Sequence, residues 1–359
     1  MSQQHSKKKL HQLTSLRGIA AWWVVLYHSR LFLNDYVDKD FMIFLSYGYL
    51  AVDLFFILSG FVIYLNYHAT VINEIPRSVL HFYWNRLARI YPVHVIMLLA
   101  YLLLAFVFIN FSSSGTAPQT YTTESFLKSL FLIQTWFGSG PLSWNVPSWS
   151  ISSEWAVYLF FPLIIYFMSR YIASLKMHFS LVLAMIVLLI IVYENQKLYS
   201  IGNNILEMAF FRTLVGFILG CVLGSIYVNF YNLLVKYRRV FLLLFLGFLS
   251  CFIFYDARDY WFMPASFFCL IAYLSVHVSF ITKTLLFGPL VYLGEISYST
   301  YMVHYFAYDL LKAGWVTSSG EVQLIYIIAS FIAVLVMSSL MHHIIEMPGQ
   351  RYFRKKFKM

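Results

Sequence analysis

The sequence predicts an all-α polytopic membrane protein, in which a bundle of about ten transmembrane helices surrounds a central polar cavity. The first observation is composition: of 359 residues, 61% are hydrophobic and only 11% are charged, and the mean hydropathy is +0.72. A soluble domain carries about 25% charged residues. A chain this apolar cannot cover its surface with polar side chains, so we expect lipid to surround most of it.

The second observation is a series of long apolar runs, each near the ~20 residues that a spanning helix needs. Ten runs qualify: 14–33, 48–67, 87–109, 148–168, 178–194, 204–228, 239–255, 260–281, 287–311 and 321–345. The apolar stretch 125–137 is too short to span, and we expect a re-entrant or interfacial helix there. The runs define a transmembrane domain at 14–345, between a polar tail at 1–13 and a basic tail at 346–359 that holds about one turn of helix.

The basic residues predict the orientation of these helices. With the N-terminus inside, 17 of the 25 Lys and Arg fall on inside segments and 6 on outside segments. This bias is typical of cytoplasmic loops. We therefore expect a multi-pass protein of the cytoplasmic (inner) membrane with both termini cytoplasmic, and no signal peptide. The net charge of +10 then reflects topology and does not indicate a nucleic-acid partner.

The third observation is that ionisable residues interrupt the apolar runs, where each costs roughly 2.5–3.5 kcal/mol at mid-membrane. In the first run, Arg17 and His28 are eleven residues apart. Eleven residues make three turns plus about 20°, so both lie on one helical face about 16 Å apart. This layout fits one long ligand or two ligands that meet. The alternative is an end-anchor at Arg17 and an interfacial histidine, and the spacing alone does not decide.

Two arginines, Arg86 and Arg89, open the third run in RLARIYP, on neighbouring positions of one face. A pair of guanidiniums binds phosphate oxygens well. The alternative is the ordinary positive fringe of a cytoplasmic loop.

Carboxylates occur in the second and fourth runs. VDLFFILSGF holds Asp53 near the outer end, and Ser59 with Gly60 further in, where close helix packing is the favoured interpretation. PSWSISSEWAVY holds Glu154, which the helix dipole would favour in a first turn. The dipole does not explain so dense a polar cluster.

The later runs add a deep cation and a polar stripe. Arg212 lies about nine residues into its run, and Gly216, Gly220 and Gly224 follow as a helix-packing seam. In GEISYSTYMVHY, Ser297, Tyr301 and His304 share one face and can form a hydrogen-bond chain. Together these residues predict a shared polar cavity. The three cysteines lie in apolar runs without metal-ligand spacing, so we expect no metal.

Six of these motifs, in order, resemble acyltransferase family 3, the integral-membrane O-acyltransferases of surface glycans. They are LRGIAAWWVVLYH, VDLFFILSGF, RLARIYP, PSWSISSEWAVY, ISYSTYMVH and IIEMPGQRYFRK. The resemblance implies acetyl-CoA or another acyl-CoA as a cytosolic co-substrate, with no permanently bound cofactor, and a glycan or glycolipid hydroxyl as acceptor. Some members carry an additional extracytoplasmic esterase-like domain, which leaves open how transfer outside the membrane is completed.

Within that framework we expect catalysis by His28 as general base, with Glu154 orienting it or binding the acceptor. Arg17, Arg86 and Arg89 would bind the donor. Candidates for lining the cavity or stabilising an oxyanion are Asp53, Ser59, Arg212, Ser297, Tyr301 and His304. A transporter or flippase of a glycolipid or acyl group is the alternative, although we detect no inverted repeat. A structural subunit explains none of the buried charges, and an oligomer stays open.

Overall fold

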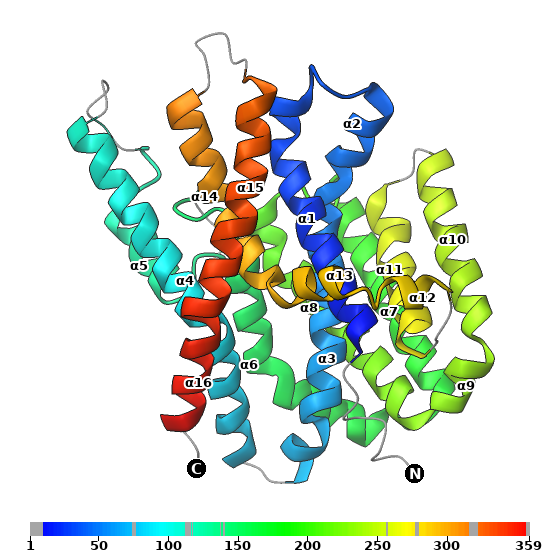
Figure 1. Cartoon of the computed structure of the whole chain (residues 1–359). Coiled ribbons are helices and arrows are strands. Elements are labelled where there is room, and N and C mark those ends of the chain that lie inside the picture. Colours follow the sequence, from blue (N-terminus) through cyan, green and yellow to red (C-terminus); the bar gives the residue numbers. More distant parts are fainter. Residues whose placement is uncertain are drawn as a thin grey trace.

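The structure is a computed structural model that describes residues 10–73, 77–111, 116, 118–136, 138, 141–255, 258–276, 280–315 and 322–356. Within these ranges the chain forms helices joined by turns, and no strand occurs (Figure 1). The all-α prediction is therefore confirmed.

Among the described residues, seven helical segments are long and apolar enough to cross a membrane, which confirms a multi-pass architecture. They are Lys39–Ile72, Ser78–Phe111, Ser148–Tyr171, Leu175–Asn195, Ile205–Asn229, Asp259–Val276 and Leu324–Lys356. Three other predicted runs correspond to α1 (His11–Leu33), α10 (Arg238–Phe254) and α14 (Ser297–Trp315). Of these, α10 has only 17 residues, and α1 and α14 carry several polar side chains. The count of ten therefore stays a prediction.

The other labelled elements include the helices that make up the seven segments above. They are α2 (Lys39–Ser46), η1 (Tyr47–Leu50), α3 (Ala51–Asn73), α4 (Arg77–Phe111), α5 (Thr123–Leu130), α6 (Ser148–Tyr171), α7 (Leu175–Asn195), α8 (Ile205–Asn229), α9 (Tyr231–Lys236), α11 (Asp259–Val276), α12 (Phe280–Thr284), α13 (Gly288–Glu295), α15 (Leu324–Leu340), the π-helix η2 (Met341–Glu346) and α16 (Met347–Lys356). The start of α1 and the end of α16 both lie toward the lower end of the bundle in Figure 1. The re-entrant or interfacial placement of 125–137, where α5 ends at Leu130, stays a prediction.

The predicted extent of helix is wrong in two segments. The run 287–311 is two helices, because α13 lies across the bundle and α14 along it (Figure 1). A Cβ on Gly294 of α13 would lie 1.9 Å from the Thr14 carbonyl oxygen of α1, so backbone contact holds α13 against α1. The expectation of about one turn of helix after residue 345 is also wrong, since helix continues through η2 and α16 to Lys356. There Gly349 packs on Pro92 of α4.

Helices α3 and α8 pack closely against each other in the bundle interior. A Cβ on Gly220 would lie 2.0 Å from the Ile57 carbonyl oxygen, and one on Gly60 2.0 Å from that of Phe217. Small residues allow such approach between membrane helices. The predicted glycine seam is therefore confirmed, and it brings Asp53 of α3 beside Arg212 of α8.

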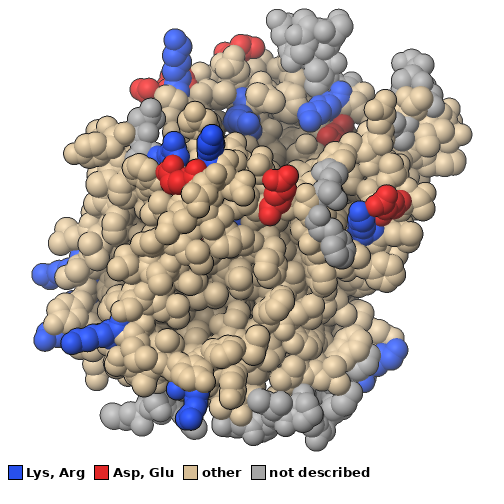
Figure 2. All heavy atoms as spheres, turned by 180° about the vertical axis from the view of Figure 1, so that it is seen from behind, with Lys and Arg blue, Asp and Glu red and all other residues tan. Residues whose placement is uncertain are grey.

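On the face shown in Figure 2, the charged residues lie mainly toward the two ends of the bundle. On the face in Figure 2, both signs gather toward the upper end, only Lys and Arg appear along the lower end, and a broad belt between them has few charges. Helices α9 and α16 lie at the lower end in Figure 1, and they contribute Lys236, Arg351, Arg354, Lys355 and Lys356. The belt fits a lipid environment.

Candidate active site

A cavity of about 130 Å³ opens between α1, α3, α4, α6 and α14, and we call it the arginine cavity. Its polar lining consists of Arg17, Ser59, Arg86, Arg89, Ser150, Glu154, Tyr158, Ser297, Tyr298 and Tyr301. Seven of the residues predicted from the sequence thus meet here: Arg17, Ser59, Arg86, Arg89, Glu154, Ser297 and Tyr301. They come from five helices far apart in the chain.

The three arginines of this cavity differ in how they are partnered. Arg89 forms an ion pair with Glu346. Arg86 donates to the Tyr67 hydroxyl at 3.2 Å, while its buried Nε has no hydrogen-bond partner among the described residues. No carboxylate in the described part of the chain lies within 4.0 Å of the Arg17 or Arg86 guanidinium. The cavity therefore has excess positive charge, which an anionic ligand would balance.

Glu154 is the acidic residue of the cavity wall. The hydroxyls of Ser59 and Tyr158 lie near its carboxylate, and the two hydroxyl oxygens are 3.0 Å apart. Arg17 attracts the carboxylate without direct ion pairing. Glu154 thus lies among polar side chains of α1, α3 and α6, without a direct ion pair among the described residues. Elsewhere in the same cavity wall, the Ser297 hydroxyl is buried without a partner among the described residues.

Glu346 is a residue of the site that the sequence analysis missed. It is fully buried at the end of η2. Besides pairing with Arg89, it accepts from Ser299 Oγ at 2.7 Å and lies 3.0 Å from His342 Nδ1. A π-helix inserts an extra residue into a turn and is frequent at functional sites. The motif IIEMPGQRYFRK could have directed attention to this carboxylate.

A second cavity of about 230 Å³ is lined by two further predicted residues, and we call it the histidine cavity. His28 and Arg212 line it, together with Tyr27, Tyr49, Trp149, Ser200, Asn203 and Tyr301. His28 therefore borders a different cavity from Arg17. The two cavities share Val52 and Tyr301 in their walls, so they meet at these two residues.

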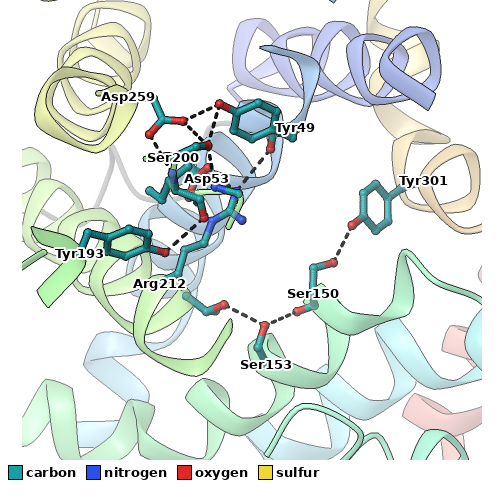
Figure 3. A network of polar contacts seen from close by, with 12 residues as sticks. Tyr49, Asp53, Ser150, Ser153, Tyr193, Ser200, Arg212, Asp259 and Tyr301 are labelled. Atoms are coloured by element: carbon teal, nitrogen blue, oxygen red, sulfur yellow. Dashed lines mark hydrogen bonds and ion pairs between the residues drawn. The ribbon is translucent and has the colours of Figure 1, made fainter. Parts of the chain in front are cut away.

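The charge of Arg212 is neutralised inside the protein. Its Nε and Nη2 donate to the two Asp53 carboxylate oxygens at 2.7 and 2.6 Å. Figure 3 shows the surrounding network, in which Asp259 accepts from Tyr49 and Ser200 at 2.5 and 2.7 Å. This pair therefore adds no net charge to the histidine cavity, whereas the arginine cavity has excess positive charge. Asp259, Tyr49 and Ser200 were not predicted from the sequence.

His304 contacts His28 at the Nδ1 atom of the His28 ring. The His304 Nε2 is 3.2 Å from His28 Nδ1, and His304 is fully buried. The predicted chain along the α14 stripe does not form between Ser297, Tyr301 and His304 side chains. Instead, the Tyr301 hydroxyl is 2.8 Å from Ser150 Oγ and donates to the Pro147 carbonyl at 3.1 Å.

Two further hollows adjoin the cavities. A vestibule of about 700 Å³ at the start of α1 and η2–α16 shares Arg17 and Arg89 with the arginine cavity. A recess of about 650 Å³ at the start of α8 shares Gly202, Asn203 and Ile205 with the histidine cavity. The hollows therefore adjoin in the order vestibule, arginine cavity, histidine cavity, recess. Among the described residues, no group of three His, Cys, Asp or Glu side chains could hold a metal ion.

This architecture, a multi-pass helical bundle with charged residues inside, agrees with comparisons with known proteins. The acyltransferase domain family, acyltransferase family 3, matches residues 10–343. The chain therefore belongs to this family, as its motifs predicted.

Curated relatives are also similar. The O-acetyltransferase OatA of Staphylococcus aureus is 24% identical over 99% of this chain and 60% of its own length. The acyltransferase MdmB of Streptomyces mycarofaciens is 33% identical over 43% of this chain and 39% of its own length. The chain thus spans less than two thirds of each relative's length. No solved structure matches the chain.

Proposed function

We propose that this protein is a membrane O-acyltransferase, specifically an O-acetyltransferase, that moves an acyl group from acyl-CoA to a hydroxyl of a cell-surface polysaccharide or glycolipid. The single observation that carries the proposal is the contact between two unlike cavities at Val52 and Tyr301. One cavity has excess positive charge, and the other holds a histidine beside a neutralised ion pair. Family membership and the relatives' names support the reaction class.

The donor enters from the vestibule in this proposal. CoA is rich in phosphates and carries its thioester at the end of a long arm. Arg86, Arg89 and Arg17 would bind the phosphates and the first part of the arm, since guanidinium groups bind phosphate in a two-pronged manner. The arm would then cross the arginine cavity toward Tyr301. The basic lower end of the surface (Figure 2) supports a cytoplasmic vestibule.

The acceptor hydroxyl enters from the recess into the histidine cavity. His28 takes the hydroxyl proton as general base while the hydroxyl oxygen attacks the thioester carbonyl carbon. The carbon–sulfur bond then breaks, and the CoA thiolate takes up a proton, so that an ester and CoA-SH are the products. Tyr301, Ser297 or Arg212 would stabilise the oxyanion, and Glu154 would orient the reacting groups. A covalent acyl-histidine is a variant of this mechanism.

One observation favours a second function. The four hollows adjoin from the start of α1 to the start of α8. A transporter or flippase of a glycolipid or acyl group would also need such a path.

The test compares the wild type with His28→Ala, both purified and reconstituted into lipid vesicles. We expect the wild type to release CoA from acetyl-CoA when glycan acceptors are present, and the variant to remain folded and inactive. Full activity of His28→Ala would exclude the histidine from the mechanism. Movement of a labelled glycolipid across the vesicle membrane without CoA release would support the transporter instead. Mass spectrometry of cell-envelope glycans with and without the protein then identifies the acyl mass.

A further inference from the structure

His304 stands next to the proposed base without lining either cavity. Its Nδ1 lies 2.7 Å from the Tyr301 carbonyl oxygen, and its Nε2 lies 3.2 Å from His28 Nδ1. The His28 Nδ1 also lies 3.1 Å from the Val24 carbonyl oxygen. Two backbone carbonyls and two imidazoles therefore form one connected set between α1 and α14.

The protonation pattern of this set follows from the acceptors. A carbonyl oxygen only accepts, so His304 must carry a proton on Nδ1 to bond with Tyr301, and His28 must carry one on Nδ1 to bond with Val24. A neutral His304 then has its lone pair on Nε2, where it accepts from His28 Nδ1–H. Neutral rings are favoured because His304 is fully buried and an unpaired buried charge is costly.

We propose that His304 is a positioning residue that fixes His28 in the tautomer with a proton on Nδ1, so that Nε2 keeps the lone pair at the histidine cavity. The inference deepens the proposed function and rests on it for its effect on catalysis. A base in the wrong tautomer presents N–H to the hydroxyl and cannot take its proton. The logic is that of an orienting group behind a catalytic histidine, here supplied by a second imidazole and two carbonyls.

Two substitutions at His304 separate positioning from packing. In His304→Gln the side-chain oxygen reaches about where Nε2 lies and can accept from His28. In His304→Asn the amide reaches only about where Nδ1 lies, so it keeps the Tyr301 bond and loses His28. We expect His304→Gln to retain kcat within about threefold and His304→Asn to lose at least ~10-fold, with KM for acetyl-CoA unchanged in both.

A control histidine lies elsewhere in the bundle. His178 of α7 is buried, with Nε2 2.8 Å from Ser225 Oγ, and it lines neither cavity. His178→Gln should leave kcat unchanged. Equal losses of kcat in His304→Gln and His304→Asn would overturn the proposal and leave His304 a packing residue.

A second measurement does not depend on activity. Nitrogen-15 NMR of histidine-labelled full-length protein in lipid reports which ring nitrogen carries the proton, and His28→Asn assigns the His28 signals. We expect Nδ1–H in the wild type and in His304→Gln, and a population with Nε2–H in His304→Asn. A wild-type His28 protonated on Nε2 would overturn the proposal. If the wild type transfers no acyl group, the proposed function fails while the tautomer result still tests the contact.

Discussion

Arg212 and Asp53 form a two-pronged ion pair in the interior of the bundle, although 159 residues separate them in the chain. Their side chains are 2% and 7% exposed, so the pair is shielded from solvent. The guanidinium also lies over the Trp149 ring, 5.4 Å from its centroid. The close α3–α8 packing at Gly60 and Gly220 brings Asp53 to Arg212, which lines the histidine cavity.

Breaking this pair should destabilise the protein strongly. Removal of one partner of a buried pair leaves an uncompensated charge and costs about 3–5 kcal/mol. We expect Asp53→Asn to lower the free energy of unfolding by about that amount, measured by denaturant titration in detergent. The double variant Asp53→Asn with Arg212→Met should recover part of the loss.

The matching control is the surface pair of Arg258 and Glu194, whose side chains are 33% and 36% exposed. Solvent screens such pairs, so Glu194→Gln should change stability little. If Asp53→Asn has the wild-type free energy of unfolding, the buried pair does not stabilise the protein as we infer.

The glycine seam gives a second prediction. A Cβ on Gly220 would lie 2.0 Å from the Ile57 carbonyl oxygen, so Gly220→Ala must push α3 and α8 apart. Overpacking of this kind costs about 1–3 kcal/mol. Gly247 of α10 is the control, because nothing lies within 4 Å of the Cβ that alanine would add. Gly247→Ala should stabilise by up to ~1 kcal/mol. Equal thermal midpoints for both variants would argue against the seam.

Much of the fold follows from the sequence because lipid imposes simple constraints. An apolar run must form a helix to satisfy its backbone polar groups in hydrocarbon, so the all-α class and most helices could be predicted. Helix limits that are set by contacts with other helices could not be predicted from the sequence. The break between α13 and α14 accompanies close contact of Gly294 with Thr14, and the continuation into α16 accompanies close contact of Gly349 with Pro92.

The candidate site could likewise be predicted only in part. Costly polar residues in apolar runs identified Arg17, His28, Glu154 and Arg212, because few other reasons keep such groups there. Their partners could not be predicted, since pairing depends on which helices pack together. Glu346 was assigned to a tail outside the membrane domain, yet it pairs with Arg89 across 257 residues.

The arginines give a third prediction. If Arg86 and Arg89 bind the donor's phosphates, Arg86→Ala with Arg89→Ala should weaken acetyl-CoA binding at least ~10-fold, since hydrogen bonds to charged groups contribute about 1.5–3 kcal/mol each. Isothermal titration with the detergent-solubilised protein measures this. The control removes two exposed arginines of α16, Arg351 and Arg354, and should leave the affinity unchanged. If the wild type and both double variants bind acetyl-CoA equally well, Arg86 and Arg89 belong to the ordinary positive fringe of a cytoplasmic loop.

The last prediction concerns Tyr158, which lies beside Glu154. Its hydroxyl lies near the Glu154 carboxylate and 3.0 Å from Ser59 Oγ, while its ring packs in the core. Tyr158→Phe keeps the ring and removes the hydroxyl beside Glu154. We expect the acyl-transfer rate to fall roughly 10-fold, because a mobile carboxylate orients the reacting groups poorly, with stability changed by only about 1 kcal/mol. Tyr166→Phe, at an exposed tyrosine of the same helix, is the control and should retain full activity. Wild-type rates for Tyr158→Phe together with an inactive Glu154→Gln would mean that Glu154 acts without this hydroxyl.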